Sequence, residues 1–144
     1  MNDAEMWKRY CEKEGVNAAY EAWAFGGAPD ELAALVLSGT KTATASAYPL
    51  YTLEGEGLPK AGDFSVILNE KDEAVCVIRT SKVYVCPFRE VSAEHAFREG
   101  EGDRSLDYWR RVHRDFFTHE MSAAGFSFDE DMPVVCEEFL RVYP

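Results

Sequence analysis

The 144-residue sequence lacks the features that would place it in a membrane or outside the cell. No apolar run approaches the ~20 residues that a helix needs to cross a bilayer. The first residues, "MNDAEMWKRYCEKEG", are charged throughout and have no apolar centre, unlike a secretory signal. Repeats and linkers are also missing. We therefore predict a single domain over residues 1–144, in the cytoplasm, with no membrane partner.

Cysteine and histidine are scarce and show no metal-binding pattern. The four cysteines, Cys11, Cys76, Cys86 and Cys136, are widely spaced and form no C-x-x-C pair. The three histidines form no H-E-x-x-H pattern, and His113 falls in an apolar helical stripe, which predicts a packed side chain. The sequence thus gives no reason to expect a metal or another cofactor.

The sequence also contains few positively charged residues. Fifteen Lys and Arg residues stand against 26 Asp and Glu residues, which gives a net charge of −11. Long nucleic acids owe most of their affinity to protein cations that neutralise phosphates. Tight binding of long RNA is therefore disfavoured and no DNA partner is expected, whereas a neutral nucleoside or a short single strand of RNA is compatible with this charge.

The sequence does contain enough apolar residues, 47%, for one closed core. Apolar spacing predicts helices over residues 3–14, within 16–27, and over 29–39, 91–100 and about 104–124. Strands are predicted over residues 38–46, 63–69, 74–88 (with a bend or bulge) and 133–143. Because helices and strands do not alternate regularly, we expect an α+β fold. It is a curved, mostly antiparallel, barrel-like sheet flanked by helices, with an N-terminal helical extension over about 1–28.

The segment "SGTKTATAS", residues 38–46, is the first candidate for chemistry. Lys41 follows Gly39, a helix-capping glycine, and is surrounded by hydroxyl residues with no carboxylate nearby. A lone lysine is usually a solvated charge, but in a dry pocket it can act as a base or bind an anion. Strict strand alternation would put Lys41 and Thr44 on opposite faces, so they share a site only if the strand begins irregularly.

The acidic turn within "REGEGDRSLDYW", residues 98–109, is the second candidate. Asp103 or Ser105 is expected to cap the long helix that follows. Glu99 and Glu101 are harder to explain as caps. Glycines that alternate with glutamates between two helices allow a carboxylate to reach a cleft, so either glutamate is a candidate.

Further candidates are cationic or aromatic. Arg79 lies in an apolar strand, where a guanidinium needs a carboxylate or a phosphate as partner. Arg110 and Arg114 belong to the densest cationic cluster, although acidic neighbours on the helix account for part of it. Tyr48 and Tyr51 follow the lysine segment in a predicted loop. They suit either the stacking of a base or the closing of a barrel mouth.

A family resemblance joins these segments. Gly39, Lys41 and Thr44 match the G-x-K-x-x-T motif of the ASCH domain, a small β-barrel family similar to the PUA RNA-binding domain. Further segments resemble the longer bacterial members in the same order, from about Trp23 to the end: "WAFG", "DELAALVLSGTKTATAS", "LPKAGDFSVIL", "EGEGDRSLDYWRRVHRDFF" and "DMPVVCEEFLRVYP". The resemblance implies a PUA-like barrel of five or six strands with flanking helices, a cleft lined by the motif residues, and an RNA-related role.

The members of this family do not share one activity. Some resemble binding modules of RNA-processing or coactivator machinery, small members are associated with amidohydrolysis of N4-acylated cytidines, and a longer bacterial member with ribonuclease activity. From the small members, the resemblance implies an RNA-related protein that binds or hydrolyses a modified nucleoside such as N4-acetylcytidine, with amidohydrolase activity as the favoured interpretation. The alternatives are a non-catalytic RNA-binding module and a ribonuclease acting on short single-stranded RNA.

For the amidohydrolase, the resemblance implies a catalytic set of Lys41, Thr44 and a glutamate, with no metal. Glu101 has the better local match before the long helix, and Glu99, the alternate, has the spacing from His95. The residues expected to bind the substrate are Gly39, Thr42, Tyr48, Tyr51, Arg79, Arg110 and Arg114.

Overall fold

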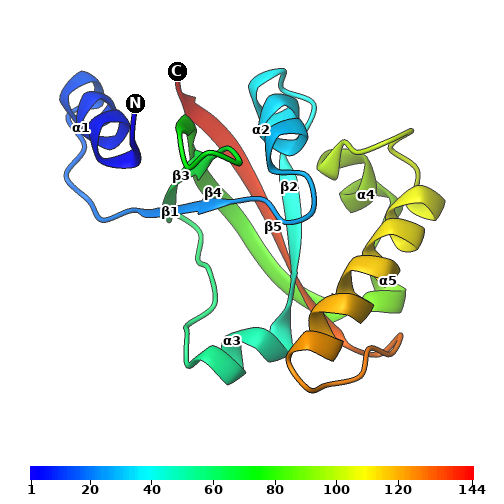
Figure 1. The fold of residues 1–144 in the computed structure, drawn as a ribbon. Helices are drawn as coiled ribbons and strands as arrows, with labels where there is room; N and C mark the ends of the chain where they lie inside the picture. Colours follow the sequence, from blue (N-terminus) through cyan, green and yellow to red (C-terminus); the bar gives the residue numbers. More distant parts are fainter.

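The computed structural model describes all residues, 1–144, as five strands in one sheet with helices around it (Figure 1). The helices are α1 (Asp3–Glu14), α2 (Pro29–Leu37), α3 (Tyr48–Glu54), α4 (Ala93–Glu99) and α5 (Leu106–Ala123), with a 3-10 turn η1 (Phe88–Glu90). The strands are β1 (Glu21–Ala24), β2 (Ala43–Ala47), β3 (Phe64–Leu68), β4 (Ala74–Pro87) and β5 (Pro133–Tyr143). None of the helices combines the length and the apolar composition needed to cross a bilayer.

The sheet is a curled half-barrel with the strand order β1-β3-β4-β5-β2. Only β1 and β3 run parallel, and the other neighbours are antiparallel. The long strands β4 and β5 cross the molecule side by side (Figure 1), and their register shifts at Val77/Ile78 and again at Thr80/Lys82. Such bulges bend a strand and increase its twist. The predicted α+β fold, with a curved, mostly antiparallel sheet and a bulge within residues 74–88, is confirmed.

Two predicted elements are wrong. The helix expected within residues 16–27 is replaced by β1, because this segment pairs with the free edge of β3, with Ala22 opposite Val66. Edge pairing satisfies backbone groups that would otherwise stay open, and this outweighs a weak helical spacing. The loop expected after β2 begins with a short helix, α3, which has Pro49 in its first turn and ends at Gly55 with φ +68°.

Helix caps define the segment that carries the acidic turn. Ser92 caps α4, and its hydroxyl accepts a hydrogen bond from the backbone N–H of His95. Of the two cap candidates for α5, Ser105 is the N-cap, and Asp103 accepts a hydrogen bond from the Ser105 N–H. The residues between Glu99 and Ser105 are therefore held at both ends by capped helices.

Three apolar clusters fix the helices on the sheet. One packs α5 through Trp109 and Phe117 against Phe88 and the start of β5. The second packs α2 against one face of β3 and β4, and the third packs α1 against the opposite face of the same strands, because Val66 and Val77 alternate with Ile67 and Cys76. The end of α2, the start of β2, the end of α4 and the start of α5 are thereby brought together beside the sheet.

Candidate functional site: a buried lysine between two glutamates

A cavity of about 1710 Å³ opens between the sheet, α2, α3 and the start of α5. Five of the residues selected from the sequence line it: Lys41, Thr44, Tyr51, Glu99 and Glu101. Lys41 precedes β2 and Thr44 lies in it, Tyr51 comes from α3, Glu99 is the last residue of α4, and Glu101 lies in the turn that follows. The structure thus joins the two candidate segments, although more than fifty residues separate them in the sequence.

The backbone around Lys41 explains how its side chain reaches the cavity. The chain leaves α2 through Gly39 at φ +81°, and the Lys41 N–H donates to the Leu35 carbonyl oxygen at 3.0 Å. The Thr42 N–H donates to the Arg98 carbonyl oxygen at 2.7 Å, which ties this segment to the end of α4. Because β2 begins only after these residues, Lys41 stands outside the strand alternation. The irregular start that a shared site with Thr44 requires is therefore present.

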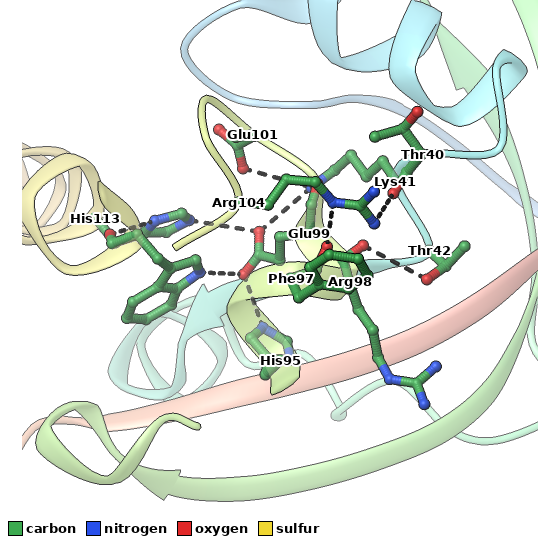
Figure 2. A network of polar contacts seen from close by, with 11 residues as sticks. Thr40, Lys41, Thr42, His95, Phe97, Arg98, Glu99, Glu101, Arg104 and His113 are labelled. Atoms are coloured by element: carbon green, nitrogen blue, oxygen red, sulfur yellow. Dashed lines mark hydrogen bonds and ion pairs between the residues drawn. The ribbon is translucent and has the colours of Figure 1, made fainter. Parts of the chain in front are cut away.

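Lys41 is buried, with 2% of its surface exposed. Its Nζ lies 3.3 Å from Glu99 Oε1 and 3.6 Å from Glu101 Oε2 (Figure 2). It also lies 5.2 Å from the centre of the Phe25 ring. A buried charge is tolerated only when it is paired and hydrogen-bonded. Glu99 and Glu101 supply the pairing. Lys41 is therefore held by both of the glutamates that the sequence offered as alternatives.

Glu99 is the centre of the polar network in Figure 2. One carboxylate oxygen accepts a hydrogen bond from Trp109 Nε1 at 2.6 Å and lies 2.7 Å from His95 Nε2. The other lies 3.3 Å from Lys41 Nζ and 3.5 Å from His113 Nε2. Burial alone would raise the pKa of Glu99, but the charges of Lys41 and His113 outweigh it and hold this pKa well below its usual range.

Glu101 behaves differently. Its burial raises its pKa, Lys41 opposes this shift, and the negative charge of Glu99 adds to it, so that the net pKa lies above the usual value. Two carboxyl groups on one ammonium therefore have opposite proton preferences: Glu99 stays ionised, and Glu101 takes up a proton more readily. Such a divided pair is typical of acid and base roles in one site.

The glycines of the turn allow this approach. A Cβ on Gly100, at φ +77°, would lie 2.6 Å from the carbonyl oxygen of Thr40. A Cβ on Gly102, at φ +58°, would lie 2.4 Å from the ring of Tyr108. The Arg104 guanidinium donates to the same Thr40 carbonyl at 3.3 Å, which closes the turn over the lysine segment. The alternation of Gly and Glu is therefore a consequence of close backbone packing.

Sequence reasoning missed His95, Trp109 and His113 as members of the network. His113 is packed as predicted, stacked on Trp109 at 4.2 Å, but it also faces Glu99. Its burial lowers its pKa, and the Glu99 charge outweighs this, so that the pKa of His113 is raised. The available signal was the i, i+4 spacing, which pairs His95 with Glu99 and Trp109 with His113 on their helices.

Several predicted binding residues lie outside the cavity. Tyr48 is exposed at the start of α3, and Gly39 and Thr42 shape the lysine segment without lining the cavity. Arg79 is exposed on β4 and lies over the Phe64 ring, so it needs no buried anion. On the outside of α5, Arg110 donates to a backbone carbonyl of η1, and Arg114 pairs at 2.7 Å with a glutamate before β5. The cationic cluster faces away from the lysine.

Glu99, Glu101 and His113 also have the composition of a metal site, because their ligand atoms lie within 4.8 Å of one another. The Lys41 ammonium, however, already lies between the two carboxylates, at the place where a cation would bind. A metal ion would have to displace a buried, paired lysine. The arrangement therefore suits proton transfer and polarisation by an ammonium group.

The ASCH domain model matches residues 21–143. The chain belongs to the ASCH domain family. A crystal structure of an ASCH domain from Lactobacillus crispatus JV V101 is 31% identical, with a TM-score of 0.90 over 98% of this chain and 94% of that one. A protein from Enterococcus faecalis V583 is 35% identical, with a TM-score of 0.90 over 97% of this chain and 87% of that one. None of the curated proteins is significantly similar to this ASCH domain.

A third structure, of the hypothetical protein PH0355, is 18% identical with a TM-score of 0.57, over 85% of this chain and 98% of that one. At this identity the likeness concerns the fold alone. The ASCH family is generally RNA-associated, and the half-barrel described above is its PUA-like architecture.

Proposed function

We propose that this ASCH domain is an amidohydrolase that removes the acyl group from N4-acylated cytidine, such as N4-acetylcytidine, in the cleft of Lys41, Thr44 and Glu101. The observation that carries the proposal is the buried lysine between two carboxyl groups of opposite proton preference, in a cavity that also presents a threonine hydroxyl. Amide hydrolysis needs a nucleophile, a base and a proton for the leaving amine, and this set provides all three.

The charge of the cavity supports a neutral substrate. Its lining includes eight Asp or Glu residues and two basic residues, Lys41 and His113. An RNA phosphate would meet strong repulsion there, whereas an acylated nucleoside carries no charge. The volume of about 1710 Å³ exceeds the ~300–1,000 Å³ of common small-molecule sites, so a nucleoside with its ribose and acyl group has room.

The reaction divides the labour among these side chains. A proton passes from the Lys41 ammonium to Glu101, and the free amine takes the hydroxyl proton of Thr44 as the Thr44 oxygen attacks the acyl carbon. When the C–N bond breaks, Lys41 returns this proton to N4, and cytidine leaves. Water then cleaves the threonine ester and releases the acid, with Lys41 and Glu101 moving the protons again. Glu99 stays ionised throughout and balances the positive charge.

The experiment is incubation of the purified protein with N4-acetylcytidine and chromatographic detection of cytidine. We expect release by the wild type, no release by Lys41→Met or Thr44→Val, and normal release by Lys71→Met, in which an exposed turn lysine is replaced. Thr44→Val is close to isosteric and keeps the ion network, so its loss of activity is not a loss of fold. The proposal fails if the wild type releases no cytidine or if Thr44→Val is fully active.

Short single-stranded RNA is the second candidate substrate, supported by the RNA association of the family and by a cavity larger than one nucleoside needs. The dependence on salt concentration distinguishes a nucleoside substrate from an RNA substrate. Cytidine release should be nearly independent of ionic strength, because the substrate is neutral. RNA binding or cleavage in the same cleft should fall steeply as salt rises.

A further inference from the structure

One buried carboxyl group in the cavity takes no part in the network around Lys41. Glu137, on β5, is 9% exposed and lines the cavity, yet its side chain makes no hydrogen bond and no ion pair within the protein. Burying an unpaired polar group costs free energy, and an apolar residue here would be more stable. The only fully buried side-chain polar atom without a partner is His95 Nδ1, so the Glu137 carboxyl oxygens keep access to the cavity and are free to bind a ligand there.

The sheet places Glu137 next to the proposed nucleophile. In the antiparallel pair of β2 and β5, Thr44 lies directly opposite Glu137. Residues directly opposite in such a pair project from the same face, with Cβ atoms ~4.5–5.5 Å apart. A ligand whose reacting group reaches Thr44 consequently has its neighbouring atoms within reach of Glu137.

The surroundings of Glu137 favour a proton on it. The titratable groups that face it are Asp63 before β3, Glu21 on β1 and Tyr51 on α3, and its strand neighbours on β4 and β2 are uncharged. Burial, with the negative charges of Asp63 and Glu21, raises the pKa of Glu137 to about 7. A neutral carboxyl group carries one donor and one acceptor side by side.

We propose that Glu137 is the specificity residue that binds the pyrimidine base, donating a hydrogen bond to N3 and accepting one from the N4–H of the acylated cytosine. This inference rests on the proposed function and adds the recognition of the base to it. N3 and N4–H are an adjacent acceptor and donor, the complement of a protonated carboxyl group, and N4 keeps one hydrogen after acylation. Binding through this pair brings the N4–acyl bond to Thr44.

The test is binding of cytidine, the product, measured by calorimetry at pH 6 and pH 8.5. Binding through the protonated carboxyl group predicts that wild-type affinity falls by about 30-fold between these pH values, in proportion to the protonated fraction for a pKa of about 7. Glu137→Gln keeps a donor and an acceptor, so its affinity should be retained and should not depend on pH. Glu137→Met, of similar shape, should bind at least about tenfold more weakly at pH 6, because both hydrogen bonds are lost.

Glu56→Gln is the control, because Glu56 lines the same cavity but is exposed; its affinity and pH dependence should equal those of the wild type. The inference is overturned if cytidine does not bind to the wild type, if Glu137→Met binds it normally, or if Glu137→Gln keeps the pH dependence. It stands if these affinities follow the expected pattern even when no acylated nucleoside is hydrolysed. The failure of catalysis and the failure of recognition are thus distinguished.

Discussion

The two walls of the cavity differ in how they treat buried charge. On the helical wall, Lys41, Glu99, His95, Trp109 and His113 form a network in which the central carboxylate has four partners. On the sheet wall, Glu137 is almost as buried and has none. The first wall has its charged groups paired and can hold reactive groups rigidly, whereas the second presents an unpaired carboxyl group to the cavity, where a ligand can bind it. We infer that the helical wall holds the groups that move protons, whereas Glu137 on the sheet wall recognises the base next to the Thr44 nucleophile.

Removal of Glu99 should break the helical wall and have the largest effect. Glu99→Ala leaves Lys41 and its aromatic neighbours without their shared acceptor, so the free energy of unfolding should fall by about 3–5 kcal/mol. Urea unfolding measures this. Glu94→Ala, which removes an exposed glutamate of the same helix, should cost no more than ~1 kcal/mol, and equal losses for the two variants would contradict the account.

The contact between the acidic turn and the lysine segment can be tested with one methyl group. Gly100→Ala adds a Cβ 2.6 Å from the Thr40 carbonyl oxygen at a positive φ, and should cost about 2–4 kcal/mol in thermal or urea unfolding. Gly55→Ala is the control, since Gly55 has φ +68° but nothing within 4 Å, and it should cost only ~1 kcal/mol. If both substitutions cost the same, the close approach is not needed to assemble the site.

Substitution of Glu137 on the sheet wall should stabilise the protein, in contrast to the substitutions on the helical wall. The pKa of Glu137 is about 7 in the folded protein, compared with 4.5 for an ordinary glutamate in the unfolded chain. Between these pH values the folded protein therefore keeps a proton that the unfolded chain releases. Stability due to this group therefore falls as pH rises from about 4.5 to 7, and the loss is complete above that range. Glu137→Gln avoids the penalty and should be more stable than the wild type by on the order of 2–3 kcal/mol at pH 8, and equally stable near pH 4.5. A destabilised Glu137→Gln at pH 8 would mean that the carboxylate has a structural partner.

The outer surface of α5 should show the smallest effect. Arg114 pairs with Glu130 at 2.7 Å outside the cavity, and both side chains are substantially exposed. Arg114→Ala should cost no more than ~1 kcal/mol in unfolding and change the rate of cytidine release less than twofold. A large loss of activity would mean that the cationic cluster guides the substrate, as its density in the sequence suggested.

The sequence predicts some parts of this molecule well for identifiable reasons. The G-x-K-x-x-T motif selects Lys41 and Thr44, which both line the cavity, and its glycine supplies the positive φ at which the chain leaves α2. The strands β3, β4 and β5 are long or strongly apolar, so their pattern is unambiguous. The four-residue β1 is too short for its alternation to outweigh a helical spacing, and only its pairing with β3 defines it.

Other features depend on contacts that no local pattern encodes. Spacing offered Glu99 and Glu101 as alternatives, whereas the turn brings both to Lys41. In the sequence, Glu137 has no feature that distinguishes it from other strand residues. Only the register of β2 and β5 shows that it lies opposite Thr44. The arginines Arg79, Arg110 and Arg114 were selected for their charge, but charge density along an element does not say which face of it meets the cavity.

The division of roles between the Thr44 nucleophile and the Glu137 recognition residue is tested most directly by steady-state kinetics with N4-acetylcytidine at pH 6, comparing the wild type, Thr44→Val and Glu137→Met. We predict that Thr44→Val abolishes kcat while its affinity for cytidine is unchanged, and that Glu137→Met raises KM at least about tenfold while it still turns over substrate. Equal effects of the two substitutions on kcat and KM, or no hydrolysis by the wild type, would contradict this account.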